Sequence, residues 1–203
     1  MKILKIIGIV LLSLIAIVVV LGLIAPKGFK IQRSVVIPTT NKEVVFKNIT
    51  MWSDFLKWNP WSSKDPNQKL TYKGEEGKVG ASYKWEGNDS VGSGEMTIVS
   101  LVPNEKVDMD LHFIKPFETT NKTIFSMAPE GEGYKVTWEM SGESPFPLNI
   151  MHLFMDMDKM IGPDFEKGLS NLKEKAMSEA AASATVAAPT VPESATADAS
   201  AAE

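Results

Sequence analysis

Cysteine is absent from this chain of 203 residues, and histidine occurs only twice. Without cysteine there is no disulfide framework, no thiolate zinc site and no thiol nucleophile. A basic excess is also missing, since the net charge at pH 7 is −4. Nucleic-acid-binding proteins present a basic face, so no nucleic-acid partner is expected.

The first part of the chain is a long apolar run. Residues 6–25 form a stretch of 20 residues in which Ser13 is the only polar side chain. A helix of this length spans roughly 30 Å, the thickness of a bilayer core. The alternative is a cleaved signal peptide, which has a shorter apolar region and an A-x-A-like site. Ala25 is preceded two residues earlier by Leu23 and followed by Pro26. This favours an uncleaved transmembrane anchor at residues 1–27.

The orientation of this anchor follows from its flanking charges. Lys2 and Lys5 precede the run, and Lys27, Lys30 and Arg33 follow it. The two sides are nearly balanced, so the positive-inside rule decides little. We expect a single-pass membrane protein with its N-terminus inside and its domain extracytoplasmic, as in a short signal anchor.

The C-terminal residues 179–203 have a different composition. Alanine, serine, threonine, proline and glutamate dominate, and no aromatic residue, leucine or isoleucine occurs. Such a segment cannot bury enough apolar surface to offset its ordering entropy, so disorder is predicted. Between the two ends, residues 28–178 are long enough for one domain with a sizeable core.

The middle of the chain alternates apolar and polar residues with a period of two. This pattern predicts strands over residues 30–38, 81–87, 94–102, 106–114, 123–127 and 134–140, with a weaker one at 68–73. Glycine, asparagine, aspartate and proline separate the runs. The pattern is typical of an antiparallel sheet with one solvent-exposed face and one apolar, buried face.

Helices are predicted at three places. Thr40 or Asn41 can cap a helix over residues 41–48, and Phe55 and Trp58 share a face of a short second helix. A long final helix is expected over residues 147–177, with a kink or break near Gly162-Pro163.

The apolar face of the predicted strands carries no acid or base. Its members are aliphatic and aromatic side chains, with only Tyr83, Thr123 and tryptophan N–H groups as polar atoms. Such a surface can hold a hydrophobic ligand but is poorly equipped for general acid–base catalysis. No catalytic residue is therefore assigned.

A methionine-rich stretch near the C-terminus raises the question of a metal site. Soft ligands for copper are present at Met151, His152, Met155, Met157 and Met160. Residues 155 and 157 lie on different faces of a helix, so these side chains do not converge. We expect no metal and no cofactor. The neighbouring acids, Asp156, Asp158, Asp164 and Glu166, are expected on a solvated face, paired with Lys159 and Lys167.

The chain resembles the SRPBCC, or START-like, superfamily, in particular the bacterial polyketide cyclase/dehydrase and lipid transport group. The resemblance covers residues 30–177 and includes a strand ending in SVVI (34–37), EVVF (43–46), and tryptophans at Trp52, Trp58 and Trp61. The stretches at 79–89, 92–98 and 113–118 are similar to members that carry an N-terminal membrane anchor. The resemblance implies an α+β helix-grip fold in a bacterial inner or cytoplasmic membrane protein.

This resemblance also implies a cavity between a curved sheet and the long helix. The side chains expected to line it are Tyr83, Trp85, Met96, Ile98, Met109, Leu111, Phe113, Phe125, Met127, Trp138, Met140, Met157, Met160 and Ile161. The alternative for each is an ordinary core position. Three functions stay open: a membrane-tethered module that binds a lipid or other hydrophobic small molecule, a polyketide cyclase/dehydratase-like enzyme, and a membrane-bound protein-interaction or stress module.

Overall fold

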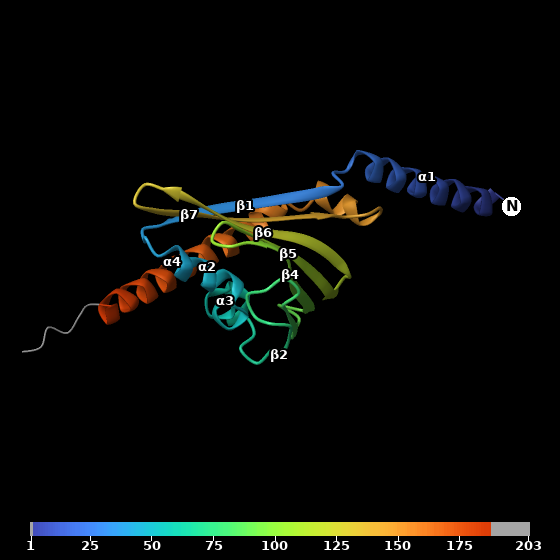
Figure 1. Ribbon diagram of the computed structural model, residues 1–203. Coiled ribbons are helices and arrows are strands. Elements are labelled where there is room, and N and C mark those ends of the chain that lie inside the picture. The colour runs from blue at the N-terminus through green and yellow to red at the C-terminus, as the bar shows by residue number, and fades with distance from the viewer. Residues whose placement is uncertain (1, 188–203) are drawn as a thin grey trace, which may run out of the picture.

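The computed structural model describes residues 2–187. Its first element, α1 (Lys2–Ile24), is an apolar helix of 23 residues that projects from one end of the domain (Figure 1). At a rise of 1.5 Å per residue, α1 is about 35 Å long. By length and composition, α1 is able to cross a membrane.

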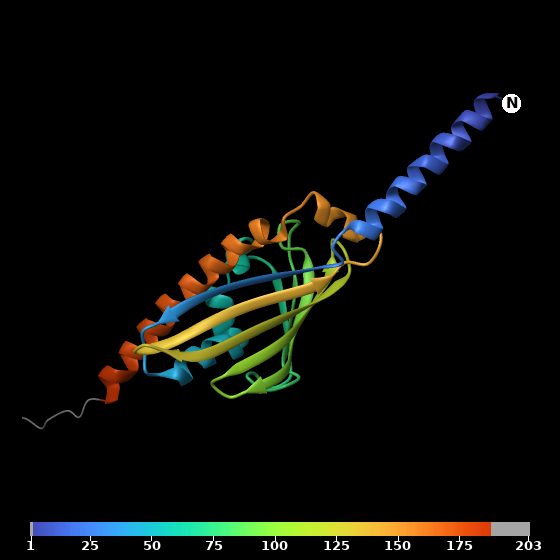
Figure 2. The same ribbon diagram turned by 90° about the horizontal axis from the view of Figure 1, so that it is seen from above.

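Seven antiparallel strands form one curved sheet in the order β1-β7-β6-β5-β4-β3-β2 (Figure 2). β1 pairs with β7, so the first and last strands lie side by side. The period-two pattern predicted every one of these strands. Their bounds are β1 (Gly28–Ile37), β2 (Lys69–Lys73), β3 (Ser82–Glu86), β4 (Ser93–Val102), β5 (Lys106–Lys115), β6 (Thr119–Glu130) and β7 (Gly133–Glu143).

Helices connect β1 to β2 and follow β7. The connection contains α2 (Lys42–Thr50), α3 (Trp52–Trp58) and the 3-10 helix η1 (Pro60–Ser63). Asn41 caps α2 as predicted, because its side-chain oxygen accepts a hydrogen bond from the backbone N–H of Val44 at 3.1 Å. The long α4 (Met157–Ala187) runs beside β1 and contacts η1, α2 and α3.

Aromatic rings fill the space where α3 and α4 meet β6 and β7. The ring of Trp138 stacks on Phe165 of α4, with centroids 4.0 Å apart, and on Phe125 at 4.9 Å. Trp58 of α3 packs edge-on against Trp138 at 5.6 Å. All four side chains are buried. Aromatic pairs in these geometries stabilise the core beyond the area that they bury.

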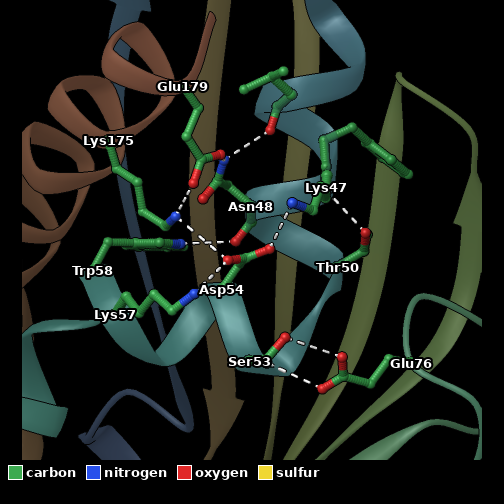
Figure 3. Close-up of polar contacts among 12 residues, drawn as sticks. Lys47, Asn48, Thr50, Ser53, Asp54, Lys57, Trp58, Glu76, Lys175 and Glu179 are labelled. Carbon is green, nitrogen blue, oxygen red and sulfur yellow. Dashed lines mark hydrogen bonds and ion pairs between the residues drawn. The ribbon is translucent and has the colours of Figure 1, made fainter. Parts of the chain in front are cut away.

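A charged cluster joins α4 to α2 and α3 (Figure 3). The Asp54 carboxylate lies 2.9 Å from Lys57 Nζ, 3.2 Å from Lys47 Nζ and 3.4 Å from Lys175 Nζ. Lys175 also pairs with Glu179, one turn later on α4. The side chain of Asp54 is only 8% exposed. A nearly buried carboxylate is tolerated here because three lysines surround it.

The final helical element differs from the prediction. The separate 3-10 helix η2 (Leu148–Leu153) precedes α4, so the break lies at residues 154–156 and Pro163 stands inside α4. Asp156 explains why a new helix begins after this break. Its Oδ1 accepts hydrogen bonds from the backbone N–H groups of Asp158 and Lys159, at 3.1 and 3.2 Å. A side chain that binds these free N–H groups starts a new helix there.

The predicted domain boundary at residue 178 falls inside α4, which continues to Ala187. Glu179 accepts a hydrogen bond from Asn48 Nδ2 at 2.7 Å, which fixes the helix beyond that boundary. Alanine, frequent in the next residues, has the highest helix propensity. The rest of the predicted disordered tail, residues 188–203, lies outside the described residues.

Candidate functional site

A cavity of about 530 Å³ lies between the inner face of the sheet and α4. Its wall is built mainly from aliphatic, aromatic and methionine side chains, as the resemblance implied. The predicted residues that line it are Tyr83, Trp85, Met96, Leu111, Phe113, Trp138, Met140, Met157, Met160 and Ile161. Phe29, Phe55, Trp61 and Phe165 complete the apolar wall from β1, α3, η1 and α4.

Four predicted side chains do not line the cavity but belong to the core: Ile98, Met109, Phe125 and Met127. Ile98 and Met109 face each other across β4 and β5, toward the β4–β5 hairpin. The rings of Trp58 and Trp138 cover Phe125. The period-two pattern identifies the inward face of a strand, but it does not show how far along the strand the cavity extends.

Trp85 forms part of the cavity wall because a glycine stands opposite. Gly94 is its partner on β4, and a Cβ at this position would lie 2.4 Å from the Trp85 ring. The indole can therefore lie across β4. Its N–H donates a hydrogen bond to the Val91 carbonyl at 3.0 Å, and its ring packs edge-on against Phe113. The indole N–H is thus bonded within the protein.

Asn121 is a cavity residue that the sequence did not reveal. It lies on the inward face of β6, two residues before Thr123, and both side chains are buried and line the cavity. The predicted strand began only at residue 123, because the preceding Thr-Thr-Asn-Lys carries no apolar signal. Side chains two residues apart on a strand point to the same face, so the inward positions of Thr123 and Phe125 imply that Asn121 also points inward.

The titratable group in the cavity interior is Tyr83. Its side chain is buried and its hydroxyl is hydrogen-bonded to Asn59. Burial raises the pKa of the Tyr83 phenol well above its usual value. The phenol therefore stays neutral at physiological pH, and it can donate a hydrogen bond but cannot act as an anionic base.

Two acidic residues and a histidine also line the cavity, at its mouth. Glu118 follows β5, Glu143 ends β7, and both side chains are exposed. His152 on η2 lies with its Nε2 2.8 Å from the Ser144 hydroxyl. These groups can meet the polar end of a molecule whose apolar part is inside.

Arg33 holds α4 against β1 at the outer side of the cavity wall. Its Nη1 lies 2.8 Å from Asp158, and its Nε lies 2.7 Å from Glu166. These hydrogen bonds raise the pKa of the Arg33 guanidinium further and lower that of Asp158. The guanidinium lies close to Gly162, where a Cβ would be 2.2 Å from Arg33 Nη2 and would displace this end of the side chain.

The ion pairs of the acidic residues differ in part from the prediction. Asp156 pairs with Lys159 at 3.1 Å, as expected. Asp158 and Glu166 pair with Arg33 rather than with Lys167, and Asp164 pairs with Lys64 at 2.6 Å. Partners from β1 and from the segment after η1 are distant in sequence, so helical spacing could not identify them.

No protein-family model and no curated protein matches the chain. Solved structures do match. The protein Mll3558 from Rhizobium loti has 15% identity, with 73% of this chain and 95% of that chain covered and a TM-score of 0.53. Major latex-like protein 151 from Panax ginseng has 13% identity, coverage of 73% and 97%, and a TM-score of 0.50.

A third similar structure is the di-domain ARO/CYC StfQ from the steffimycin biosynthetic pathway. It has 10% identity and a TM-score of 0.56, over 76% of this chain and 52% of that chain. At these identities the similarity concerns the fold alone. Together with the curved seven-stranded sheet and the long C-terminal helix, it confirms the predicted helix-grip fold.

Proposed function

We propose that this protein is a membrane-tethered binding module for a lipid or another hydrophobic small molecule. The observation that carries the proposal is the cavity of about 530 Å³, whose interior wall is apolar apart from neutral groups such as Tyr83, Asn59 and Asn121. Ligand pockets typically measure about 300–1,000 Å³ and combine apolar walls with a few polar groups. An apolar ligand gains free energy there by leaving water.

The layout of the chain supports a tether. We assign residues 1–27 to a single-pass anchor in a bacterial inner or cytoplasmic membrane, with the domain on the extracytoplasmic side. We assign the domain to residues 28–187, because α4 continues past residue 178 to Ala187. A tethered cavity stays close to the bilayer, where hydrophobic molecules are concentrated.

A cyclase- or dehydratase-like enzyme is the second candidate. The pair of Tyr83 and Asn59 favours it, since a buried neutral phenol can donate a hydrogen bond to a substrate carbonyl. The carrier function needs no such chemistry. Tyr83→Phe should therefore leave binding of a hydrophobic probe unchanged if the protein is a carrier, and it should stop product formation if the protein is an enzyme.

The binding proposal is tested by titrating residues 26–187 with a dansyl-labelled fatty acid. We expect one saturable site in the wild type. Leu111→Trp places an indole in the cavity, and we expect it to weaken binding about tenfold or more, equivalent to about 1.4 kcal/mol. Circular dichroism verifies that each variant is folded.

The matched control is Val102→Trp, which adds the same ring at an exposed position at the end of β4. We expect this control to bind like the wild type. Equal affinity in Leu111→Trp and in the control would show that the probe binds outside the cavity, and the proposal would then be wrong.

A further inference from the structure

We infer that the rim of the cavity is a membrane-contact surface, so that the cavity opens against the bilayer itself. The surface consists of six apolar side chains, which we call the mouth collar: Phe117, Phe146, Leu148, Met151, Leu153 and Phe154. The inference rests on the proposed tethering by α1, but it does not depend on which ligand the cavity holds.

The mouth collar is exposed although its members are large and apolar. Phe154 is 78% exposed, Phe117 63% and Phe146 58%. They come from the turn between β5 and β6, the segment after β7, η2 and the start of the break before α4. Phe117, Leu148 and Met151 also line the cavity. A group of large apolar side chains left exposed around one cavity mouth marks a contact with a partner or a membrane.

The sheet register places the mouth collar at the end of the domain where α1 enters. Gly28, the first residue of β1, pairs with Glu143, the last residue of β7. The turn with Phe117 lies at the same end, because Asn121 near the start of β6 pairs with Gly142 near the end of β7. Figures 1 and 2 both show η2 beside the C-terminal end of α1.

Specific contacts fix α1 against η2. Asn149 Nδ2 donates a hydrogen bond to the Gly22 carbonyl at 2.7 Å, and Asn149 is fully buried. The ring of Phe146 lies on Gly22, where a Cβ would be 2.4 Å away. The apolar surface of α1 therefore continues directly into the mouth collar.

This continuity identifies the occupant as a lipid bilayer. When α1 spans a membrane, its C-terminal end lies at the interface, and the attached collar is held at the same level. Aromatic side chains concentrate at this depth in membrane proteins. Lys27 follows α1 and Lys115 precedes the Phe117 turn, while Glu118 and Glu143 are exposed at the same end, so charges of both signs surround the collar at the level of the headgroups.

The test uses the full chain, whose lack of cysteine permits single-cysteine spin labels without background. Phe117→Cys, Phe154→Cys, Ile15→Cys and Val102→Cys are reconstituted in phosphatidylcholine vesicles. Ile15 lies in the middle of α1, and Val102 is an exposed apolar position at the opposite end of the sheet. Collisions of each label with oxygen and with a water-soluble nickel complex are compared by electron paramagnetic resonance.

We expect the oxygen-to-nickel collision ratio at 117 and 154 to be several-fold higher than at 102. If this ratio is high at 15 but as low at 117 and 154 as at 102, the collar does not contact the membrane, although α1 still spans it. If the ratio is also low at 15, α1 does not span the membrane and the proposed tether is wrong. Dipolar broadening between labels at 117, without oxygen enrichment, would place a second copy of the chain on the collar and also overturn the inference.

Discussion

Asp54 provides a quantitative test of the packing of α4. Burial raises the pKa of Asp54 and is the largest single effect, but hydrogen bonds from Lys57 and Lys47 and the charge of Lys175 together outweigh it. The pKa falls from 3.8 to about 2. Because the folded pKa is below the unfolded one, the unfolded chain takes up the proton first. The stability from this carboxylate is complete above about pH 4 and is lost as the pH falls toward 2.

The size of the effect follows from the two pKa values. Converting the difference between 3.8 and about 2 at roughly 1.36 kcal/mol per pKa unit gives about 2 kcal/mol. Asp54→Asn removes this contribution and leaves three lysines facing an amide. We expect the free energy of unfolding at pH 7 to fall by about 2 kcal/mol, and the difference from the wild type to vanish toward pH 2.

Urea unfolding of residues 26–187 between pH 7 and pH 2 measures this difference. Asp156→Asn is the matched control, because asparagine keeps the Oδ1 that caps α4 and the substitution removes only an exposed ion pair with Lys159, so stability should change much less. A loss that stays the same at every pH, or an equal loss in the control, would refute the account of the cluster.

Three further outcomes are expected. Phe165→Ala should lower the free energy of unfolding by about 3–5 kcal/mol because the ring is buried on Trp138, whereas the exposed Phe154→Ala should change it by less than about 0.5 kcal/mol in the same urea assay. Pro163→Ala should raise the free energy of unfolding by up to about 3 kcal/mol, since proline inside α4 cannot donate a backbone hydrogen bond, and a decrease would contradict this. Asn149→Ala should broaden the distances between spin labels on α1 and α4 in the reconstituted protein, because the hydrogen bond to α1 is lost; an unchanged distribution would show that this bond does not fix α1.

The sequence predicted the sheet well because each strand has one buried face. Period-two alternation marked the strands and placed residues such as Met96 and Leu111 on the inward face. It could not separate cavity from core, since Ile98 and Met109 show the same alternation deeper in the domain. That distinction depends on how far α3 and its rings reach over the sheet, which is set by tertiary packing.

The other differences between the sequence prediction and the structure have local causes. The start of β6 was overlooked because Thr119–Asn121 is polar, although Asn121 faces the cavity. The sequence predicts a kink or break near Gly162-Pro163, whereas the hydrogen bonds of Asp156 determine where α4 begins. Arg33 on β1 was not identified as the partner of Asp158, since a contact between distant segments leaves no periodic signal.

Native mass spectrometry of residues 26–187, purified without detergent, tests the central claim most directly. We predict a reproducible bound mass of roughly a few hundred daltons, the ligand size suited to a cavity of about 530 Å³. The bound mass should disappear in Leu111→Trp and persist in Val102→Trp. A folded domain that carries no bound molecule, and takes up none of the phospholipids or fatty acids offered to it, would contradict the claim that this cavity binds a hydrophobic ligand.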